Sequence, residues 1–157
     1  MTTTTAEPEP IALCWSGGKD SALALAALRR DSRCRVALLV TTVPAEFDRV
    51  SIHSVTRSLL RHHAEPIGLP LKEVFVPPWP SNTAYEEAMG DAFREIRASG
   101  IRRIAFGDIF LADLKAYRDA LLASQGLSGV YPLWNRSTPD LVGEFIASGF
   151  RAITVCV

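Results

Sequence analysis

The alternation of short apolar runs with longer amphipathic stretches narrows the possible folds of this chain more than any other feature. Strands are expected at residues 11–15, 36–42, 73–76, 103–107, 129–133 and 152–157, and helices at about 19–30, 53–65, 83–99, 111–124 and 139–148. Strands that alternate with helices in this way pair in parallel, and the helices cover both faces of the sheet. The pattern therefore predicts an α/β protein with three α/β/α layers and a mostly parallel, doubly wound sheet.

Length and composition limit the class of protein. With 157 residues, of which 48% are hydrophobic, the chain suits one domain with a substantial core. The 17 basic and 17 acidic side chains cancel, so no global charge attracts nucleic acid or an anionic membrane, and we expect neither as a partner. No apolar run approaches the roughly 20 residues that span a bilayer.

Cysteine usage and the first residues bear on location and domain boundaries. Cys14, Cys34 and Cys156 form neither a CxxC pair nor a metal-ligand spacing, and no signal-peptide pattern precedes them. A reducing cytoplasm is therefore the expected location. Residues 1–10 are polar and contain prolines, so we expect a disordered leader there and one domain over residues 11–157.

A polar loop joins the first predicted strand to the first predicted helix. It consists of Ser16, Gly17, Gly18, Lys19, Asp20 and Ser21. In a doubly wound sheet, ligands bind beyond the carboxyl ends of the strands. Paired glycines let a ligand approach backbone N–H groups, and a helix N-terminus adds free amides and a positive dipole end. The loop therefore predicts a phosphate site to which the serine hydroxyls and the lysine contribute. The alternative is a simple turn followed by a solvated first helical turn.

The type of phosphate site follows from the charged pair. The carboxylate of Asp20 repels a phosphate unless Mg²⁺ bridges them, since this cation binds oxygen ligands from both sides. We therefore expect Asp20 to be a magnesium ligand. A Walker A loop is excluded, because Leu13 replaces its first glycine and Asp20 its final Ser or Thr, and the GxGxxG fingerprint is absent.

The sequence also resembles a known superfamily. "SGGKDS" (residues 16–21) is similar to the signature of the PP-loop ATP pyrophosphatases. "SIHSVTRSLLRHHAEPIGLPL" (51–71), "FGDIFLADLKAYRDALLASQGLSGVYPLW" (106–134) and "LVGEFIASGFRAITVCV" (141–157) resemble its diphthine–ammonia ligase branch and the bacterial relatives of that branch. The resemblance extends over nearly everything from Ile11 onward. It implies the HUP, or adenine nucleotide alpha-hydrolase-like, fold.

The resemblance implies an ATP-dependent, AMP-forming ligase that uses Mg²⁺. ATP would be split between its α and β phosphates, and an adenylated carboxylate would be amidated by ammonia. The carboxylate, on a protein side chain or a metabolite, is unknown. Lys19 and Asp20 would act on the phosphates, and the adenine would lie near Val40 and Thr41, at the end of the second strand.

Two departures from that branch matter. The segments at 107–109 (GDI) and 113–115 (DLK) replace a Gly-Ala and acidic-Tyr-Gln pattern of true diphthine ligases, which favours the bacterial group. Family members also continue past the strand expected at 152–157, so we expect their C-terminal extension to be absent. The alternative function is therefore an ATP-binding module without turnover, or a subunit that needs a partner. Apolar Ile153 and Val155 on an edge strand would support a homodimer.

Three further polar residues are candidates for substrate contacts. Asp108 follows the fourth predicted strand, where it would contact substrate or metal, or cap the helix that starts at 111. His53 would contact substrate or phosphate at the start of the second helix, or cap that helix. Arg136 would bind an anionic substrate group or face solvent.

The remaining features have plainer interpretations. His62 and His63 are expected to interact with the negative end of the second helix or to face water. The segment at 77–80, which contains Trp79, is expected together with Tyr85 to pack over the sheet rather than to wall a pocket. Residues 44–49 would form a flap.

Overall fold

A sheet of five strands, each parallel to its neighbours, forms the centre of the computed structural model, which describes residues 7–45, 49–50 and 55–154. The strand order is β5-β2-β1-β6-β7. These strands are β1 (Glu9–Cys14), β2 (Cys34–Pro44), β5 (Leu71–Val76), β6 (Arg103–Ala105) and β7 (Ser128–Val130). The short strands β3 (Arg49–Val50) and β4 (Val55–Thr56) pair antiparallel with each other. The predicted α/β fold with a parallel sheet is confirmed.

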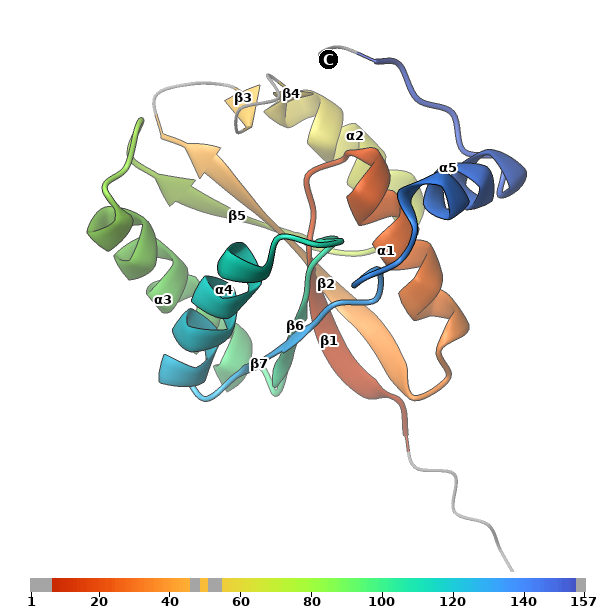
Figure 1. Ribbon diagram of the computed structural model, residues 1–157. Coiled ribbons are helices and arrows are strands. Elements are labelled where there is room, and N and C mark those ends of the chain that lie inside the picture. Colours follow the sequence, from red (N-terminus) through yellow and green to blue (C-terminus); the bar gives the residue numbers. More distant parts are fainter. Residues whose placement is uncertain (1–6, 46–48, 51–54, 155–157) are drawn as a thin grey trace, which may run out of the picture.

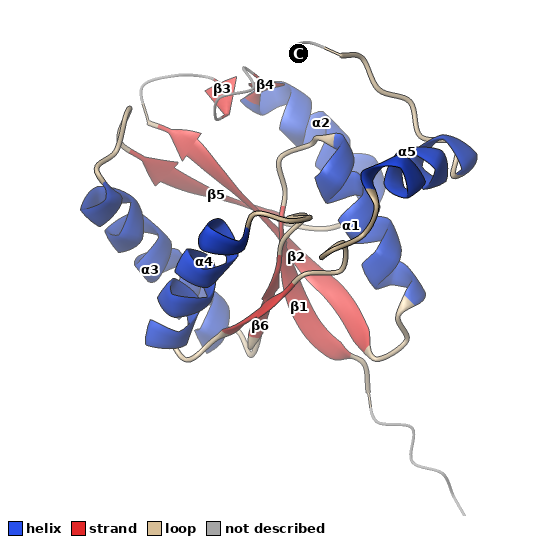
Figure 2. Cartoon of the chain, in the orientation of Figure 1, coloured by secondary structure: helices blue, strands red, loops and turns tan. Residues whose placement is uncertain are grey.

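Helices cover both faces of this sheet, as Figures 1 and 2 show. They are α1 (Lys19–Arg30), α2 (Arg57–Ile67), α3 (Asn82–Ala98), α4 (Ala112–Ser124) and α5 (Thr138–Ala147). One core cluster joins Ile11 and Leu13 of β1 to helices α1, α2 and α5. A second cluster joins Ala12 to α3 and α4. Successive side chains of a strand point to opposite faces, so β1 is buried on both sides and the molecule has three layers.

Capping residues mark the start of several helices. Side-chain hydroxyls cap three of them: Thr56 accepts from the Leu59 N–H before α2, and Ser81 and Ser137 act similarly before α3 and α5. Helices α1 and α4 have no such cap, because their N-cap residues are Gly18 and Leu111. Among the described residues, no helix is long and apolar enough to cross a membrane.

Three predicted boundaries need correction. Helix α2 begins at Arg57 rather than at residue 53, and His53 lies outside the described residues. Residues 152–154 of the last predicted strand are not in a strand, and Ile153 is 89% exposed; residues 155–157 lie outside the description. Alternating apolar residues form a strand only where a neighbouring strand is present to pair with them. Strand β1 starts at Glu9, where its carboxylate pairs with Arg103 at 3.1 Å, so it includes two residues predicted to be leader.

An ion-pair cluster fastens α2 to the edge strand β5. The Glu73 carboxylate accepts hydrogen bonds from Arg57 at 2.9 Å and from Arg61 at 2.6 Å. These two guanidinium groups hold the pKa of Glu73 at about 2, well below the ordinary value of a glutamate. The Glu73 side chain is only 13% exposed, so solvent screens the cluster weakly. The cluster adds a polar contact between α2 and β5 to the packing of Leu60 and Ala64 in the core.

We expect Glu73→Gln to destabilise the protein at pH 7 by roughly 1 to 2 kcal/mol, because the lost carboxylate is hydrogen-bonded to two cations. The pKa of Glu73 is lower in the folded than in the unfolded chain, so its contribution is complete above about pH 4.5 and disappears as the pH falls towards 2. Urea unfolding across this range should therefore show wild type and variant converging. The exposed Glu95, which pairs with Lys72, provides the control: Glu95→Gln should destabilise the protein clearly less than Glu73→Gln. Equal losses for both variants would contradict the assignment.

Candidate functional site

The loop between β1 and α1 has the backbone shape that a phosphate site needs. The Trp15 N–H donates to the Val40 carbonyl at 2.7 Å, so the chain is still in the sheet at Trp15. Gly17 then adopts φ +72°, a left-handed conformation that favours glycine. Gly18 follows in an extended conformation and precedes α1 directly. The paired glycines thus turn the chain sharply from the sheet into the helix, as predicted.

The two serines hold the loop together. The Ser21 hydroxyl donates to the Gly18 carbonyl at 2.9 Å, and the Ser16 hydroxyl accepts from the Gly18 N–H at 3.3 Å. The two hydroxyl oxygens lie 3.3 Å apart. Ser21 is buried and Ser16 is exposed. Ser21 therefore supports the loop from inside, and Ser16 is the serine that faces solvent.

The charged residues of the loop are accessible. The Lys19 ammonium lies 2.9 Å from both carboxylate oxygens of Asp20. The two side chains are 57% and 40% exposed, respectively. An exposed pair of this kind contributes little stability and separates easily. Both groups are therefore free to exchange partners when an ionic ligand enters.

Gly107, which the sequence analysis did not single out, brings the end of β6 against the first turn of α1. A Cβ atom at Gly107 would lie 2.9 Å from the carbonyl carbon of Asp20 and 3.1 Å from the backbone nitrogen of Ser21. Both contacts are to backbone atoms, which cannot rotate away. Because β6 neighbours β1 in the sheet, the residues after β6 lie near the loop that follows β1. The sequence does not show that the two backbones come close enough to require a glycine.

Asp108 is held by an ion pair. Its carboxylate pairs with Arg118 of α4, and the Asp108 side chain is 15% exposed. The Arg118 guanidinium also lies 4.6 Å from the ring centre of Phe106. The N-cap residue of α4 is Leu111, which makes no side-chain cap. The alternative of Asp108 as the cap of this helix is therefore wrong, and Asp108 is a fixed carboxylate at the rim next to Gly107.

Cys14 is unsuited to nucleophilic chemistry. Burial raises the pKa of its thiol to about 12, with smaller opposing effects from the charges of Arg118 and Asp108. A thiol with so high a pKa is not ionised at neutral pH. Cys14 is therefore an inert core residue at the end of β1.

The predicted adenine contacts lie inside a strand. Val40 and Thr41 are both buried, and β2 continues to Pro44. Thr41 is in register with Glu73 of β5. The carboxyl end of β2 therefore lies beyond the region predicted for adenine, and the role of Val40 and Thr41 stays a prediction.

Arg136 lies at the other end of α1. The Glu144 carboxylate accepts from Arg136 at 2.6 Å and from Arg30 at 2.6 Å. Arg30 is the last residue of α1, and at about 1.5 Å per residue the two ends of this helix are about 16 Å apart. The structure therefore brings Arg136 to the α1–α5 contact and not to the loop, where Lys19 begins the helix.

The two histidines of α2 differ in position. A Cβ atom at Gly17 would lie 2.7 Å from Leu60 Cδ2 and 3.3 Å from His63 Nδ1. Leu60 and His63 are three residues apart and share a helix face. His63 thus lies beside the loop, which was not predicted, while the exposed His62 points in another direction along the helix. The sequence shows that His63 and Leu60 are three residues apart in a helix. It does not show that this face of α2 packs against Gly17.

The proline-rich segment at 77–80 behaves differently from expectation. Trp79 is 95% exposed and has φ +52°, so the prediction that it packs over the sheet is wrong. Prolines on both sides restrict the backbone of this turn and keep the indole outside the core. Tyr85 packs against the α3-side core as expected, and burial raises its pKa.

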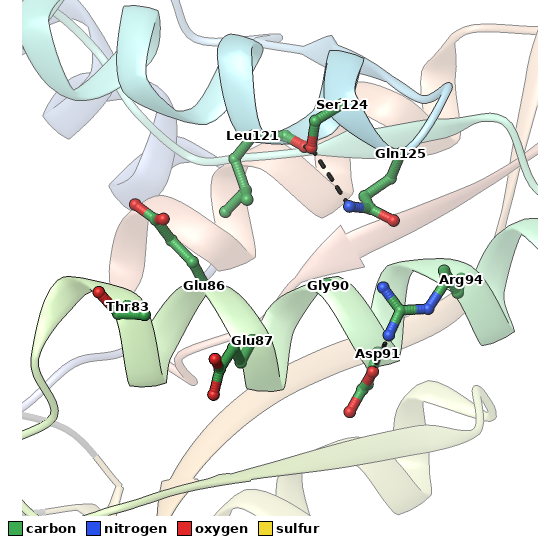
Figure 3. A pocket seen from close by; sticks show the side chains of 9 residues that line it. All are labelled: Thr83, Glu86, Glu87, Gly90, Asp91, Arg94, Leu121, Ser124 and Gln125. Carbon is green, nitrogen blue, oxygen red and sulfur yellow. Dashed lines mark hydrogen bonds and ion pairs between the residues drawn. The ribbon is translucent and has the colours of Figure 1, made fainter.

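A groove of about 480 Å³ runs between α3 and α4. Figure 3 shows Glu86, Glu87 and Asp91 of α3 on one side of it and Leu121, Ser124 and Gln125 on the other. The groove belongs to the helix layer on the face opposite α1. It contains none of the residues predicted for nucleotide binding, so its size does not make it the candidate site.

The loop suits a magnesium ion that arrives with a phosphate ligand. No group of three or more His, Cys, Asp or Glu side chains among the described residues forms a metal site of its own. Mg²⁺ is commonly held by one or two carboxylates together with substrate phosphates and water. The exposed Asp20 carboxylate at the start of α1 fits this arrangement.

Comparison with known proteins agrees with this geometry. The family model described as diphthamide synthase N-terminal domain matches residues 10–128, which is more than half of the chain. The match includes the β1–α1 loop, α2, and β6 with Gly107 and Asp108. No curated protein matches the chain.

We expect Gly107→Ala to destabilise the protein by about 1 to 3 kcal/mol, because its Cβ would meet the backbone of α1. Gly143 provides the control: it lies within α5, and a Cβ there has no neighbour within 4 Å. Gly143→Ala should be neutral or stabilising by up to about 1 kcal/mol. Denaturant unfolding measures both, and a Gly107→Ala variant as stable as Gly143→Ala would show that the close contact is absent.

Proposed function

We propose that this chain, which belongs to the diphthamide synthase N-terminal domain family of PP-loop ATP pyrophosphatases, is an ATP-dependent, AMP-forming ligase that activates a carboxylate for amidation by ammonia. The observation that supports the proposal best is the loop of residues 16–21. Its glycines turn directly into an uncapped helix whose first turn carries an accessible lysine and aspartate.

The loop can hold a polyphosphate by three means. The N-terminal amides of α1 have no side-chain cap from Gly18, and amides of this kind bind anions well. Lys19 adds a mobile positive charge, 57% exposed. Ser16 adds an exposed hydroxyl. Asp20 would hold Mg²⁺, which when bound neutralises part of the charge on the phosphate oxygens.

The proposed reaction needs no nucleophile from the protein. A carboxylate oxygen of the substrate forms a bond to the α phosphorus, and the bond from that phosphorus to the bridging oxygen of the β phosphate breaks. Ammonia then attacks the acyl carbon, AMP leaves with the bonding electrons, and the surplus proton passes to solvent. Lys19 and the α1 amides are placed to stabilise the charge that develops on the departing pyrophosphate.

Asp108 is our candidate for a substrate contact. Its carboxylate sits at the carboxyl end of β6, next to the glycine that touches α1, and Arg118 fixes its orientation. A carboxylate in this position can accept hydrogen bonds from the amine that enters. This role, like the identity of the acid, is part of the proposal.

Asp20→Asn tests the magnesium role. We expect the variant to bind ATP about tenfold more weakly than wild type in the presence of Mg²⁺, because it lacks an anionic ligand for the metal. Without Mg²⁺ the two proteins should bind ATP similarly, or the variant slightly better, since one repulsive charge is gone. Calorimetry with and without Mg²⁺ measures this. Equal affinities in Mg²⁺ would remove Asp20 as a metal ligand.

Phosphorus NMR tests the reaction itself. We expect AMP and pyrophosphate to form when the purified chain is incubated with ATP, Mg²⁺, ammonia and a pool of carboxylates. Lys19→Ala should abolish the products, whereas Lys72→Ala, a lysine paired with Glu95 on the α3 side, should not. Formation of ADP and phosphate would contradict cleavage between the α and β phosphates. Tight ATP binding without products under all conditions would favour a non-catalytic module.

A further inference from the structure

We propose that His63 of α2 contacts the phosphate groups of the nucleotide and so adds a second helix to the phosphate site. This inference rests on the proposed function, because it takes the β1–α1 loop as the ATP site. It adds a residue from a second helix, more than forty positions along the chain from the loop.

The position of His63 is determined by the buried residues next to it. Leu60 is fully buried and Ala64 is 4% exposed, so this face of α2 is pressed into the core cluster that includes α1. Leu60 Cδ2 lies so near Gly17 that a Cβ there would approach it to 2.7 Å. One helical turn further, His63 Nδ1 lies 3.3 Å from the same Cβ position. The imidazole thus lies beside Gly17, in the middle of the loop.

This contact gives Gly17 a second reason to be glycine. Its φ of +72° already disfavours other residues. A side chain at this position would also push into Leu60 and into the space between the loop and the His63 ring. Gly17 therefore lets the loop backbone lie close to both Leu60 and the His63 imidazole.

His63 has no partner among the described residues to give up when a ligand binds, unlike three other basic groups of the molecule. Its side chain is exposed, and it makes no hydrogen bond or ion pair with the residues that the structure describes. By contrast, Lys19 is paired with Asp20, Arg118 with Asp108, and Arg61 with Glu73. An imidazole N–H donates to phosphate oxygens in either protonation state, and more strongly when the ring is charged.

Binding measurements on matched histidine variants test the inference. We expect His63→Ala to weaken binding of ATP and of inorganic pyrophosphate by about five- to tenfold, and to leave adenosine binding unchanged. His62→Ala is the control, because His62 is equally exposed and adjacent but about 100° further round the helix. It should change none of the three affinities. Both substitutions replace an exposed helical residue with alanine, so the fold should tolerate them.

A second measurement reports on the ring directly. In NMR spectra of wild type, pyrophosphate should shift the imidazole resonances of His63, with little change for those of His62. Adenosine should shift neither ring. This readout does not depend on turnover.

The outcomes separate the two proposals. If wild type binds neither ATP nor pyrophosphate, the proposed function fails and this inference fails with it. If wild type binds both, but His63→Ala binds them as His62→Ala does and pyrophosphate leaves the His63 ring unperturbed, the inference alone is overturned. An equal loss of ATP and adenosine affinity in His63→Ala would also overturn it, because the residue would then shape the loop and not read the phosphates.

Discussion

The first turn of α1 is enclosed by two close approaches of backbone, and the candidate site depends on both. Gly17 lies under Leu60 of α2, and Gly107 lies against the carbonyl of Asp20. A methyl group at either position would meet another atom at less than 3.0 Å. These contacts determine where the loop turns, and they bring α2 from one side and the end of β6 from the other. The positions of the polar loop residues follow from these two contacts.

Much of the fold around the loop could be predicted from the sequence. The apolar runs correspond to the five strands of the sheet, and α1 covers the predicted residues 19–30, because its apolar positions recur at helical spacing up to two arginines. The sharp turn of the loop at residues 16–21 was predicted from its paired glycines and its place between strand and helix. Pairings across the chain could not be predicted. Glu144 pairs with two arginines from other parts of the chain, one of them more than a hundred residues away. From the sequence alone, many other carboxylates could have been the partner of either arginine.

The wrong predictions have physical causes of two kinds. The segment at 152–154 has strand-like residues, but a strand forms only beside another strand, and sequence alone does not say whether that neighbour is present. Trp79 has a large apolar ring, which favours burial, yet the prolines around it restrict the backbone and leave the ring in solvent. His63 is exposed, as expected, but its place beside the loop was not predicted, because only the packing of its neighbour Leu60 brings it there.

The charges around the loop suggest how binding proceeds. Lys19 and Asp20 pair with each other at 2.9 Å, so the loop presents little net charge to solvent. A polyphosphate with its metal offers a better partner to each: phosphate oxygens to the lysine and Mg²⁺ to the aspartate. One exposed ion pair, which is weak in water, is then exchanged for two interactions in a more enclosed place. Either exchange alone would leave the other charge without its partner. Under the proposed function, the adjacency of Lys19 and Asp20 would therefore couple phosphate binding to metal binding and favour the metal–nucleotide complex over either component.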